Sequence, residues 1–468
     1  MTEKRKRKLA MPDTLIIVAS VVLLVAILSW IIPSGTYDYQ EMNINGRIRN
    51  VAIDGTYHTI DKSEVTTTRF LGFFSVLYRG CVEAADVIFM ILCCCGTFGV
   101  VVKTGAFHAG IGTILKKLKG KEILLVPIIM LIFGLGGSVF GMASEFYGFY
   151  PLIVGLGVAL GYDAMFGFAI IAVGEFVGFM GATLNPYSVG IAQTISGVEL
   201  YSGTGYRTIC FVIFMVISII YVMMYGRKIK KNPGASVVFG EKNIHAFDRD
   251  ELNEYSFTLK DGLVLLDVLV VLVVLMFGLI KWGWDFPQLC GLFLLMSMIA
   301  AAICKWSPNK WCSEFIESAK TAMWGCILTG IAKAITVVMQ DAQIMDTVIY
   351  GLSNVLKNAP HAVSAQVMLV VQTLINFFIP SATGQASATM PIMAQLADII
   401  GVSRQTAVLA FQFGDGLSNI FWPTADIVII CGLGGISLQK WYKWFTPLFL
   451  ILFATQAILL GIATGIGF

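Results

Sequence analysis

Long apolar segments alternate with short polar ones along most of the chain. A helix needs about 20 predominantly apolar residues to cross the hydrocarbon core of a bilayer. Gly80–Val102 and Tyr206–Tyr225 reach that length. Four further stretches are even more uniformly apolar: Thr14–Ile32, Leu263–Ile280, Gly291–Cys304 and Phe445–Gly465. The pattern predicts an all-α polytopic membrane protein with the lipid bilayer around it.

Composition supports this class and excludes an ordinary soluble enzyme. Charged residues make up 13% of the chain, whereas soluble domains carry roughly a quarter. The ten cysteines fall mostly inside apolar segments without paired spacing, and the four histidines are scattered. Such cysteines behave as small buried hydrophobic residues, so we expect no disulfide framework, no metal site and no cofactor.

Basic residues indicate how the chain is oriented. The run Lys4–Lys8 precedes the first apolar segment, which ends without the small residues of a signal-peptide cleavage site. Lys and Arg near short flanks stay cytoplasmic, so we expect a cytoplasmic N-terminus and a multi-pass protein of the cell membrane. An orientation signal explains the basic tail better than nucleic-acid binding does. The polar segment Ser34–Arg69 is then outside, and Lys116–Lys121 is inside.

The chain contains one polar pattern twice. Gly141-Met-Ala-Ser144 is matched by Gly384-Gln-Ala-Ser387. Both copies continue in the same order with a proline, a glycine and an acidic residue after a glycine: Pro151 and Pro391, Gly161 and Gly401, Glu175 and Asp415. Polar, helix-breaking segments at matching places in two halves of a membrane protein indicate a transport site.

We therefore divide the chain into four parts. These are an N-terminal span with an external loop (1–70), a first repeat (71–231), a cytoplasmic loop with linking spans (232–320) and a second repeat (321–468). The lysine cluster at 116–121 has only a single lysine in its counterpart, Gly351–Pro360. That loop lacks the signal for cytoplasmic retention, so the two repeats are predicted to be inverted in the membrane.

Each repeat is predicted to contain a re-entrant helical hairpin followed by a broken transmembrane helix. The hairpins are expected at about 134–160 and 379–400, with Ser144 and Ser387 at their tips, because irregular backbone at membrane depth must line protein or water. A small-residue helix-packing interface is the alternative. The broken helices are expected at about 163–200 and 404–435. Proline interrupts a helix, although a kink without any ligand would look the same.

The broken helices also supply the candidate binding groups. Half-helix ends direct N–H dipoles at anions and spare carbonyls at cations. Suitable neutral ligands are the hydroxyls and amides of Thr183, Asn185, Ser418, Asn419 and Thr424, with Na⁺ possible near the two asparagines. Acidic residues dominate the same segments: Glu145, Glu175, Asp415 and Asp426. Ionisable groups at this depth are costly and imply a polar cavity. No Arg or Lys lies on the breaks themselves, which favours a cationic or zwitterionic solute, a coupling cation such as Na⁺ or H⁺, or both. The main basic residue at comparable depth is Lys333, for which an ion pair with one of these acids is the alternative to a solute contact.

Three motifs resemble those of the YfcC/DcuC-type carriers of the ion-transporter superfamily: Gly174–Ser188, Pro380–Ser387 and Gly414–Asn419. The resemblance covers nearly the whole chain after the first span. It implies inverted repeats, two hairpins, two broken helices, a homodimer and an elevator-like movement. By motif position it implies binding residues at Ser144, Glu145, Thr183, Asn185, Thr383, Ser387, Asp415 and Asn419.

We expect a secondary active transporter of small charged solutes that works by alternating access. Amino acids of the arginine/ornithine type fit an acidic cavity best. A Na⁺- or H⁺-coupled carrier of C4-dicarboxylates or short carboxylates is the alternative. A membrane-embedded enzyme is disfavoured because no His or Cys nucleophile accompanies the acids, and no nucleotide-binding motif is present. A passive channel would differ from a carrier in showing no saturable, trans-stimulated flux.

Overall fold

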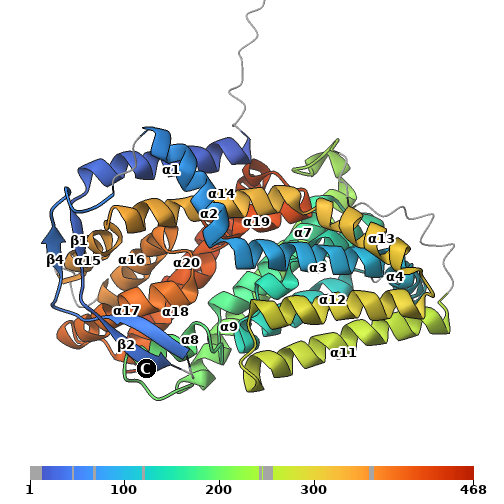
Figure 1. Ribbon diagram of the computed structural model, residues 1–468. Coiled ribbons are helices and arrows are strands. Elements are labelled where there is room, and N and C mark those ends of the chain that lie inside the picture. The colour runs from blue at the N-terminus through green and yellow to red at the C-terminus, as the bar shows by residue number, and fades with distance from the viewer. Residues whose placement is uncertain are drawn as a thin grey trace, which may run out of the picture.

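The computed structural model describes residues 13–44, 47–66, 70–118, 122–241, 245, 257–357 and 363–468. Helices dominate, and the few strands gather at the left end in Figure 1. Strand β1 (Ser34–Thr36) pairs with β4 (His58–Ile60), and β2 (Tyr39–Ile44) pairs with β3 (Arg47–Ala52), both antiparallel. This end is called the strand end below, and the opposite end the far end.

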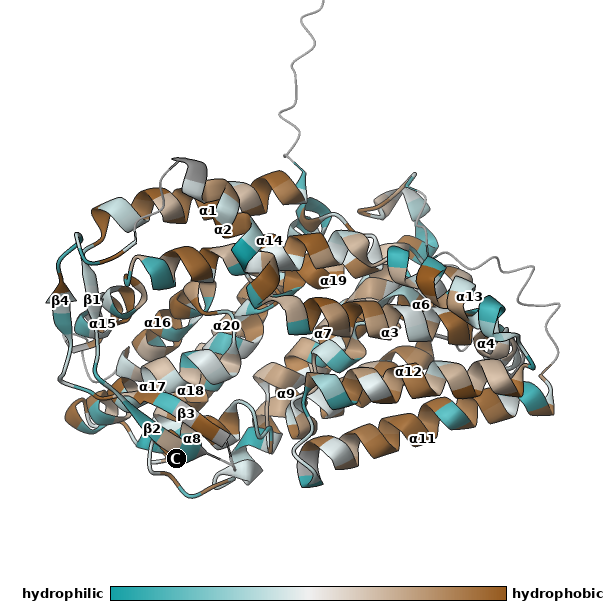
Figure 2. Ribbon diagram, viewed as in Figure 1, coloured by the Kyte–Doolittle hydropathy of each residue, from teal (hydrophilic) through white to brown (hydrophobic). Residues whose placement is uncertain are grey.

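Seven of the described helices are long and apolar enough to cross a membrane: α1 (Thr14–Ile31), α3 (Ala85–Lys103), α9 (Thr204–Lys231), α11 (Leu259–Lys281), α12 (Phe286–Ile303), α14 (Met323–Asp341) and α20 (Leu438–Gly465). Figure 2 shows α11 and α12 apolar along most of their length. This confirms the predicted class of an all-α polytopic membrane protein. The basic run Lys4–Lys8 and residues 119–121 lie outside the described residues, so the predicted orientation stays a prediction.

Polar residues start these apolar helices. Thr258 accepts a hydrogen bond from the N–H of Asp261, whose carboxylate accepts from the Thr258 N–H in return, and α11 begins there. Asp285 starts α12 in the same manner together with Gln288. Such capping pairs satisfy N–H groups that the first turn leaves free, which matters most where no water is at hand.

Part of the chain forms an outer group of helices. Besides α1, α3, α11, α12 and α14, it contains α2 (Phe70–Glu83), α4 (Ala106–Leu118), α13 (Pro308–Lys320) and α15 (Met345–Lys357). Helix α2 packs on α14, whereas α12 and α13 pack on α3. A Cβ atom at Gly80 would lie 2.3 Å from the Gly330 carbonyl oxygen, so the contact between α2 and α14 needs this glycine.

The remaining helices form an inner group in which one order of elements occurs twice. The first series is α5 (Leu125–Leu135), α6 (Phe149–Ala159), α7 (Ala164–Met180), α8 (Val189–Ile195) and α9; the second is α16 (Ser364–Phe378), α17 (Ala382–Ile399), α18 (Arg404–Ser418), α19 (Asp426–Gly434) and α20. Every residue of α7 is buried. The Gln412 side-chain amide donates to the Phe179 carbonyl at 2.7 Å and joins α18 to α7. The domain limits and the inversion of the repeats stay predictions.

Helix α17 is continuous through Pro391, and Gln372 on α16 pairs with both Gln385 and Thr389 on α17. The polar segment expected to open the second hairpin at 379 follows directly after α16, and the one expected to open the first at 134 includes the end of α5. The limits of the two hairpins, like those of the domains, stay predictions.

Candidate functional site

The chain turns after α5 at a glycine in the left-handed conformation. Helix α5 ends in one π-helical turn, Gly136–Phe140, and Gly141 then takes a left-handed φ of +69°. A Cβ atom at Gly141 would lie 2.4 Å from the Asn185 side-chain oxygen. Only glycine fits this conformation and this contact. The turn at Gly141 therefore packs directly against the break that follows α7.

Hydrogen bonds hold the first broken helix to that turn. Helix α7 ends at Met180, and the Thr183 N–H donates to the Ser138 carbonyl at 2.9 Å. The Asn185 side-chain oxygen accepts from the N–H groups of Tyr187 and Ser188 at 2.9 and 3.2 Å, just before α8 begins. Thr183 and Asn185 therefore stabilise the break itself, and both are buried.

The second hairpin turns at Pro380, which cannot donate a backbone hydrogen bond. The Ser381 hydroxyl then accepts from the Gly384 N–H and starts α17. The prediction that Ser387 lies at the tip is wrong: Ser387 lies in the second turn of α17 and donates to the Thr383 carbonyl at 2.8 Å. Thr383 is the predicted site residue that lies next to the tip.

A buried asparagine that sequence analysis missed organises the second broken helix. The Asn376 side-chain N–H₂ lies 2.9 Å from an Asp415 carboxylate oxygen and 3.2 Å from the Asn419 side-chain oxygen. All three residues are at most 4% exposed. Thr424 donates to the Phe377 carbonyl at 2.7 Å, which holds the interrupted segment against the end of α16. Asp415, Asn419 and Thr424, predicted separately, are thus brought together.

Two hydrogen bonds connect the first set of breaks with the second. The Tyr147 hydroxyl donates to Asp426 at 2.9 Å, which joins the first hairpin to the start of α19. The Thr383 hydroxyl donates to the Tyr187 carbonyl at 2.9 Å, which joins the second hairpin to the segment before α8. Each hairpin therefore contacts the half-helix of the other series. The four interruptions meet in one region inside the inner group, which we name the junction.

Carboxylates gather around the junction. Glu145, four residues after Gly141, accepts a hydrogen bond from the Ala143 N–H at 3.0 Å. Glu175, in the middle of α7, accepts from the Tyr150 hydroxyl at 2.8 Å. One oxygen of Glu175 and one of Asp415 have no hydrogen-bond partner among the described residues, although both side chains are fully buried. Buried polar groups are normally hydrogen-bonded, so these two oxygens are exceptions.

The same carboxylates influence each other electrostatically. Asp426 lies close enough to both Glu175 and Asp415 for their charges to interact, and Glu145 lies within range of Glu175. Ser144, at the predicted tip of the first hairpin, lies beside the Tyr147 hydroxyl. None of the hydrogen bonds and ion pairs found for these four acids in the described part of the chain involves a basic side chain.

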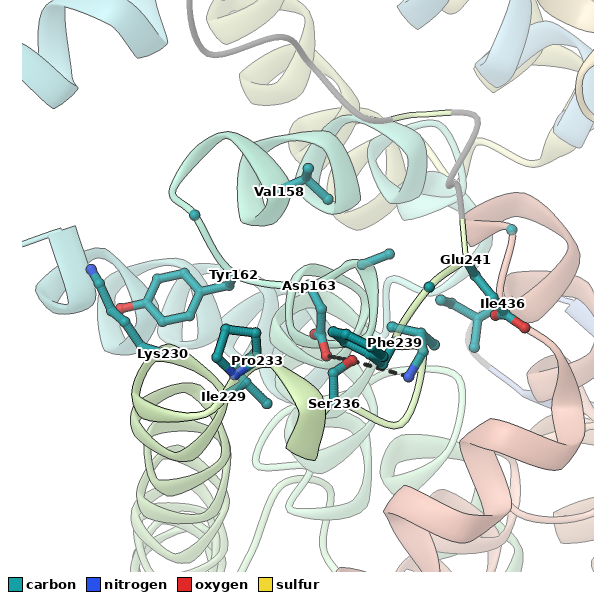
Figure 3. A pocket seen from close by; sticks show the side chains of 15 residues that line it. Val158, Tyr162, Asp163, Ile229, Lys230, Pro233, Ser236, Phe239, Glu241 and Ile436 are labelled. Atoms are coloured by element: carbon teal, nitrogen blue, oxygen red, sulfur yellow. Dashed lines mark hydrogen bonds between the residues drawn. The ribbon is translucent and has the colours of Figure 1, made fainter.

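A cavity of about 500 Å³ at the far end has different surroundings (Figure 3). Asp163 in its wall accepts from the Phe166 N–H at 2.7 Å, as the cap of α7, and from the Ser236 hydroxyl at 2.6 Å. Lys230 lies 5.0 Å above the Tyr162 ring. The charged groups of this cavity are thus occupied in fastening the segment after α9 to the turn before α7.

Nothing in the described ranges groups three or more His, Cys, Asp or Glu side chains as a metal site would require. The polar residues that sequence analysis missed are Asn376, Tyr147 and Tyr150. A weak signal exists for one of them: Gln372 and Asn376 are four residues apart in an apolar helix, which places two amides on one face. The tyrosines lie among ordinary aromatic residues and carry no such signal.

Membrane-spanning helices that surround a buried junction of interrupted helices define a membrane transporter. The family described as DcuC, C4-dicarboxylate anaerobic carrier, matches residues 11–465, and the chain belongs to this family.

Two curated relatives match along nearly their whole length. A protein of Escherichia coli (strain K12) with the provisional name basic amino acid antiporter YfcC is 32% identical, over 97% of this chain and 96% of the relative. An uncharacterized protein of Haemophilus influenzae is 27% identical over 98% and 97%. The family and its named members are transporters rather than enzymes.

Two solved structures are also similar, at low TM-scores. The YdaH transporter of Alcanivorax borkumensis has a TM-score of 0.44 at 14% identity, with 98% of this chain and 99% of that chain covered. MtrF of Neisseria gonorrhoeae has a TM-score of 0.43 at 16% identity, with 97% and 96% covered. At these TM-scores the likeness adds nothing to the assignment.

Proposed function

We propose that this protein is a secondary active transporter that exchanges basic amino acids, of the arginine-for-ornithine type, by alternating access. One observation carries the proposal: the junction holds four carboxylates, of which Glu145, Glu175 and Asp415 are buried and Asp426 is partly buried, and none of their contacts among the described residues is with a basic side chain. A buried, unneutralised acid is costly at membrane depth, so it is kept where it meets a cation. The name of the Escherichia coli relative, which refers to basic amino acid antiport, points to the same solutes.

In this proposal the two ends of the solute meet different groups. The guanidinium or ammonium end meets the free oxygens of Glu175 and Asp415, with Glu145 nearby. The carboxylate end meets the N-terminus of α17 next to Thr383, where the helix dipole favours a negative charge. A dicarboxylate bound here would place two negative charges among four acids. The dicarboxylate reading, which the family description suggests, is therefore the less favoured one.

The arrangement of helices supports an elevator-like movement. The inner group carries the whole junction, and it contacts the outer group through few helix pairs, chiefly α14 with α19 and α15 with α16 and α17. A body that carries its own binding site can move past the remaining helices without losing the site. The coupling ion, Na⁺ or H⁺, and the homodimer remain predictions from sequence.

Uptake into proteoliposomes tests the proposal. Labelled arginine is supplied outside, with and without ornithine inside, and we expect saturable uptake that internal ornithine stimulates at least several-fold. The matched experiment supplies labelled succinate in place of arginine. Uptake of succinate but not arginine would establish the dicarboxylate carrier instead, and flux without trans-stimulation would indicate a channel. A thermal-shift screen of purified protein against amino acids and dicarboxylates identifies binding independently of transport.

A further inference from the structure

Arg207 is a buried arginine in the first turns of α9, at the strand end. The residue is 1% exposed, and its Nε and Nη1 atoms have no hydrogen-bond partner among the described residues. The Nη2 atom donates to the Gln405 side-chain oxygen at 3.4 Å, which is longer than a normal hydrogen bond. A guanidinium group stays protonated in proteins, so this side chain buries a positive charge.

No acidic side chain forms an ion pair with Arg207 in the part of the chain that the structure describes. Asp398 pairs with Arg404 at 2.7 Å, and Glu199 is exposed. The Phe468 ring lies under the guanidinium, with its centroid 5.9 Å from Cζ, while the Phe468 backbone oxygen accepts from the Thr406 hydroxyl at 3.3 Å. An aromatic face attracts a cation but has no net charge, so the place as a whole stays positive.

The N-terminus of α9 adds positive potential at the same place. Helix α9 is 28 residues long and starts at Gly203, which has a left-handed φ of +71° and offers no side-chain cap. The N–H groups of Thr204, Gly205 and Tyr206 have no hydrogen bond to any described residue. Free N–H groups and the helix dipole make such a terminus attractive to anions.

The Arg207 side chain is directed at this terminus. Helical side chains lean toward the N-terminal end of their helix. Arg207 and Gly203 also face the same two side chains: a Cβ atom at Gly203 would lie 2.5 Å from the Gln405 amide nitrogen and 2.6 Å from the Phe468 ring. The unpaired guanidinium nitrogens and the free backbone N–H groups therefore lie together at one end of α9.

We propose that a small monovalent anion of the chloride type binds between Arg207 and the N-terminus of α9 and is the counter-charge of the buried guanidinium. A buried charge is normally paired, and removing a charge from water is costly unless an opposite charge compensates it. The two free nitrogens are enclosed, so the Phe468 ring has to turn aside when the anion enters. The anion is a structural ligand, and its binding does not depend on which solute the protein carries.

The anion stabilises a corner where three segments of the inner group meet. Gln193 on α8 donates to the Ser202 carbonyl at 3.0 Å and to the Gln405 side-chain oxygen at 3.1 Å. Gln405 on α18 donates in turn to the Ser202 hydroxyl at 2.9 Å. Because Arg207 contacts the same Gln405 oxygen, compensating its charge holds α8, the segment before α9 and α18 together. Helix α8 follows the first helix break, so the anion supports that break from its far side.

Thermal unfolding in different anions tests the site. The purified wild type is compared in chloride and in gluconate at equal ionic strength, because gluconate is too large for an enclosed site while general screening stays the same. A ligand that binds the folded state stabilises it by mass action, so chloride should raise the unfolding temperature by several degrees in a saturable manner. Equal unfolding temperatures in the two anions would overturn the proposal.

Two variants assign the response to Arg207. Arg207→Gln removes the charge and keeps an amide, and it should abolish the response to chloride. Arg79→Gln is the matched control, because Arg79 is an exposed arginine paired with Asp341 in the outer group, and it should retain the response. A response of the same size in Arg207→Gln would contradict the proposed site.

Bromide locates the anion without any variant, so the test does not depend on whether Arg207→Gln folds. Bromide is a heavier halide of similar size, and crystals of the wild-type protein grown in bromide should show an anomalous peak beside the Arg207 guanidinium. Chloride in excess should remove this peak. Crystals that show no anomalous peak at this place would also overturn the proposal.

Discussion

The Tyr147 hydroxyl donates a hydrogen bond to the Asp426 carboxylate at 2.9 Å, and it joins a buried tyrosine to a partly buried aspartate inside the inner group. The tyrosine comes from the first hairpin and the aspartate from the second broken helix, more than half of the chain further on. A charged hydrogen bond between the two series makes the junction one unit, because a shift of one hairpin must be followed by the opposite half-helix.

Tyr147→Phe should therefore uncouple the two series without unfolding the protein. Hydrogen bonds to charged groups contribute about 1.5–3 kcal/mol, so we expect exchange to slow roughly tenfold or more. Tyr221→Phe is the matched control, because Tyr221 donates to the Trp444 carbonyl at 2.8 Å, between α9 and α20 and away from the junction. Both variants are compared by initial rates in proteoliposomes and by thermal unfolding. Equal slowing in both would show that any lost hydrogen bond has this effect.

Asn376→Leu should destabilise the second broken helix. The amide is the donor to both Asp415 and Asn419, and an apolar replacement of similar size leaves these acceptors without it. An unsatisfied buried polar group costs about 1–3 kcal/mol, and more when it is charged. We expect a lower unfolding temperature in detergent and little remaining transport. A variant as stable as the wild type would show that water replaces the amide.

Asp415→Asn tests the charge rather than the hydrogen bond. The asparagine keeps an oxygen that can accept from Asn376, so the protein should fold with nearly unchanged stability. Arginine exchange should nevertheless fall at least tenfold, since the free carboxylate oxygen is the proposed partner of the cationic end. Arginine titrations by calorimetry separate binding from movement. Unchanged uptake kinetics would remove Asp415 from the site.

Gly141→Ala should disrupt the first turn. The left-handed φ of +69° strains any other residue, and the new methyl group would meet Asn185. We expect a loss of several kcal/mol in stability, seen as a lower unfolding temperature and poor yield. Gly205→Ala is the control, because no atom lies within 4 Å of a Cβ placed there. It should be neutral or slightly stabilising, since alanine favours the helix α9. A normal yield for Gly141→Ala would mean that the turn rearranges.

The places where the helices break could be predicted, because their cause is local. Proline and glycine interrupt a helix whatever surrounds it, and Pro380 and Gly141 lie at the turns. The extent of the individual helices could not be predicted as well. Pro391 lies within α17, which continues through it and packs along α18. The presence of proline or glycine indicates where a helix can break, and tertiary packing determines whether it does.

The partners of the candidate residues depend on contacts between distant segments. Asn376 meets Asp415 only because α16 packs along α18, and Tyr147 meets Asp426 only because the two series interlock. Sequence analysis likewise found residues 34–69 polar but did not predict strands there. The strands β2 and β3 are short, and the Tyr39 hydroxyl at the start of β2 donates to Asp346, some 300 residues away in sequence.

Thr383 provides the most direct test of how the second hairpin contacts the first series. Its hydroxyl donates to the Tyr187 carbonyl at 2.9 Å, and a neutral hydrogen bond of this kind contributes about 0.5–1.5 kcal/mol. Thr383→Val keeps the shape but loses the donor, so we expect exchange to change by roughly two- to tenfold. Thr383→Ser keeps the donor and should behave like the wild type. If only Thr383→Val loses activity, the contact between α17 and the segment before α8 takes part in transport. If both variants lose activity equally, the methyl group matters and the hydrogen bond does not.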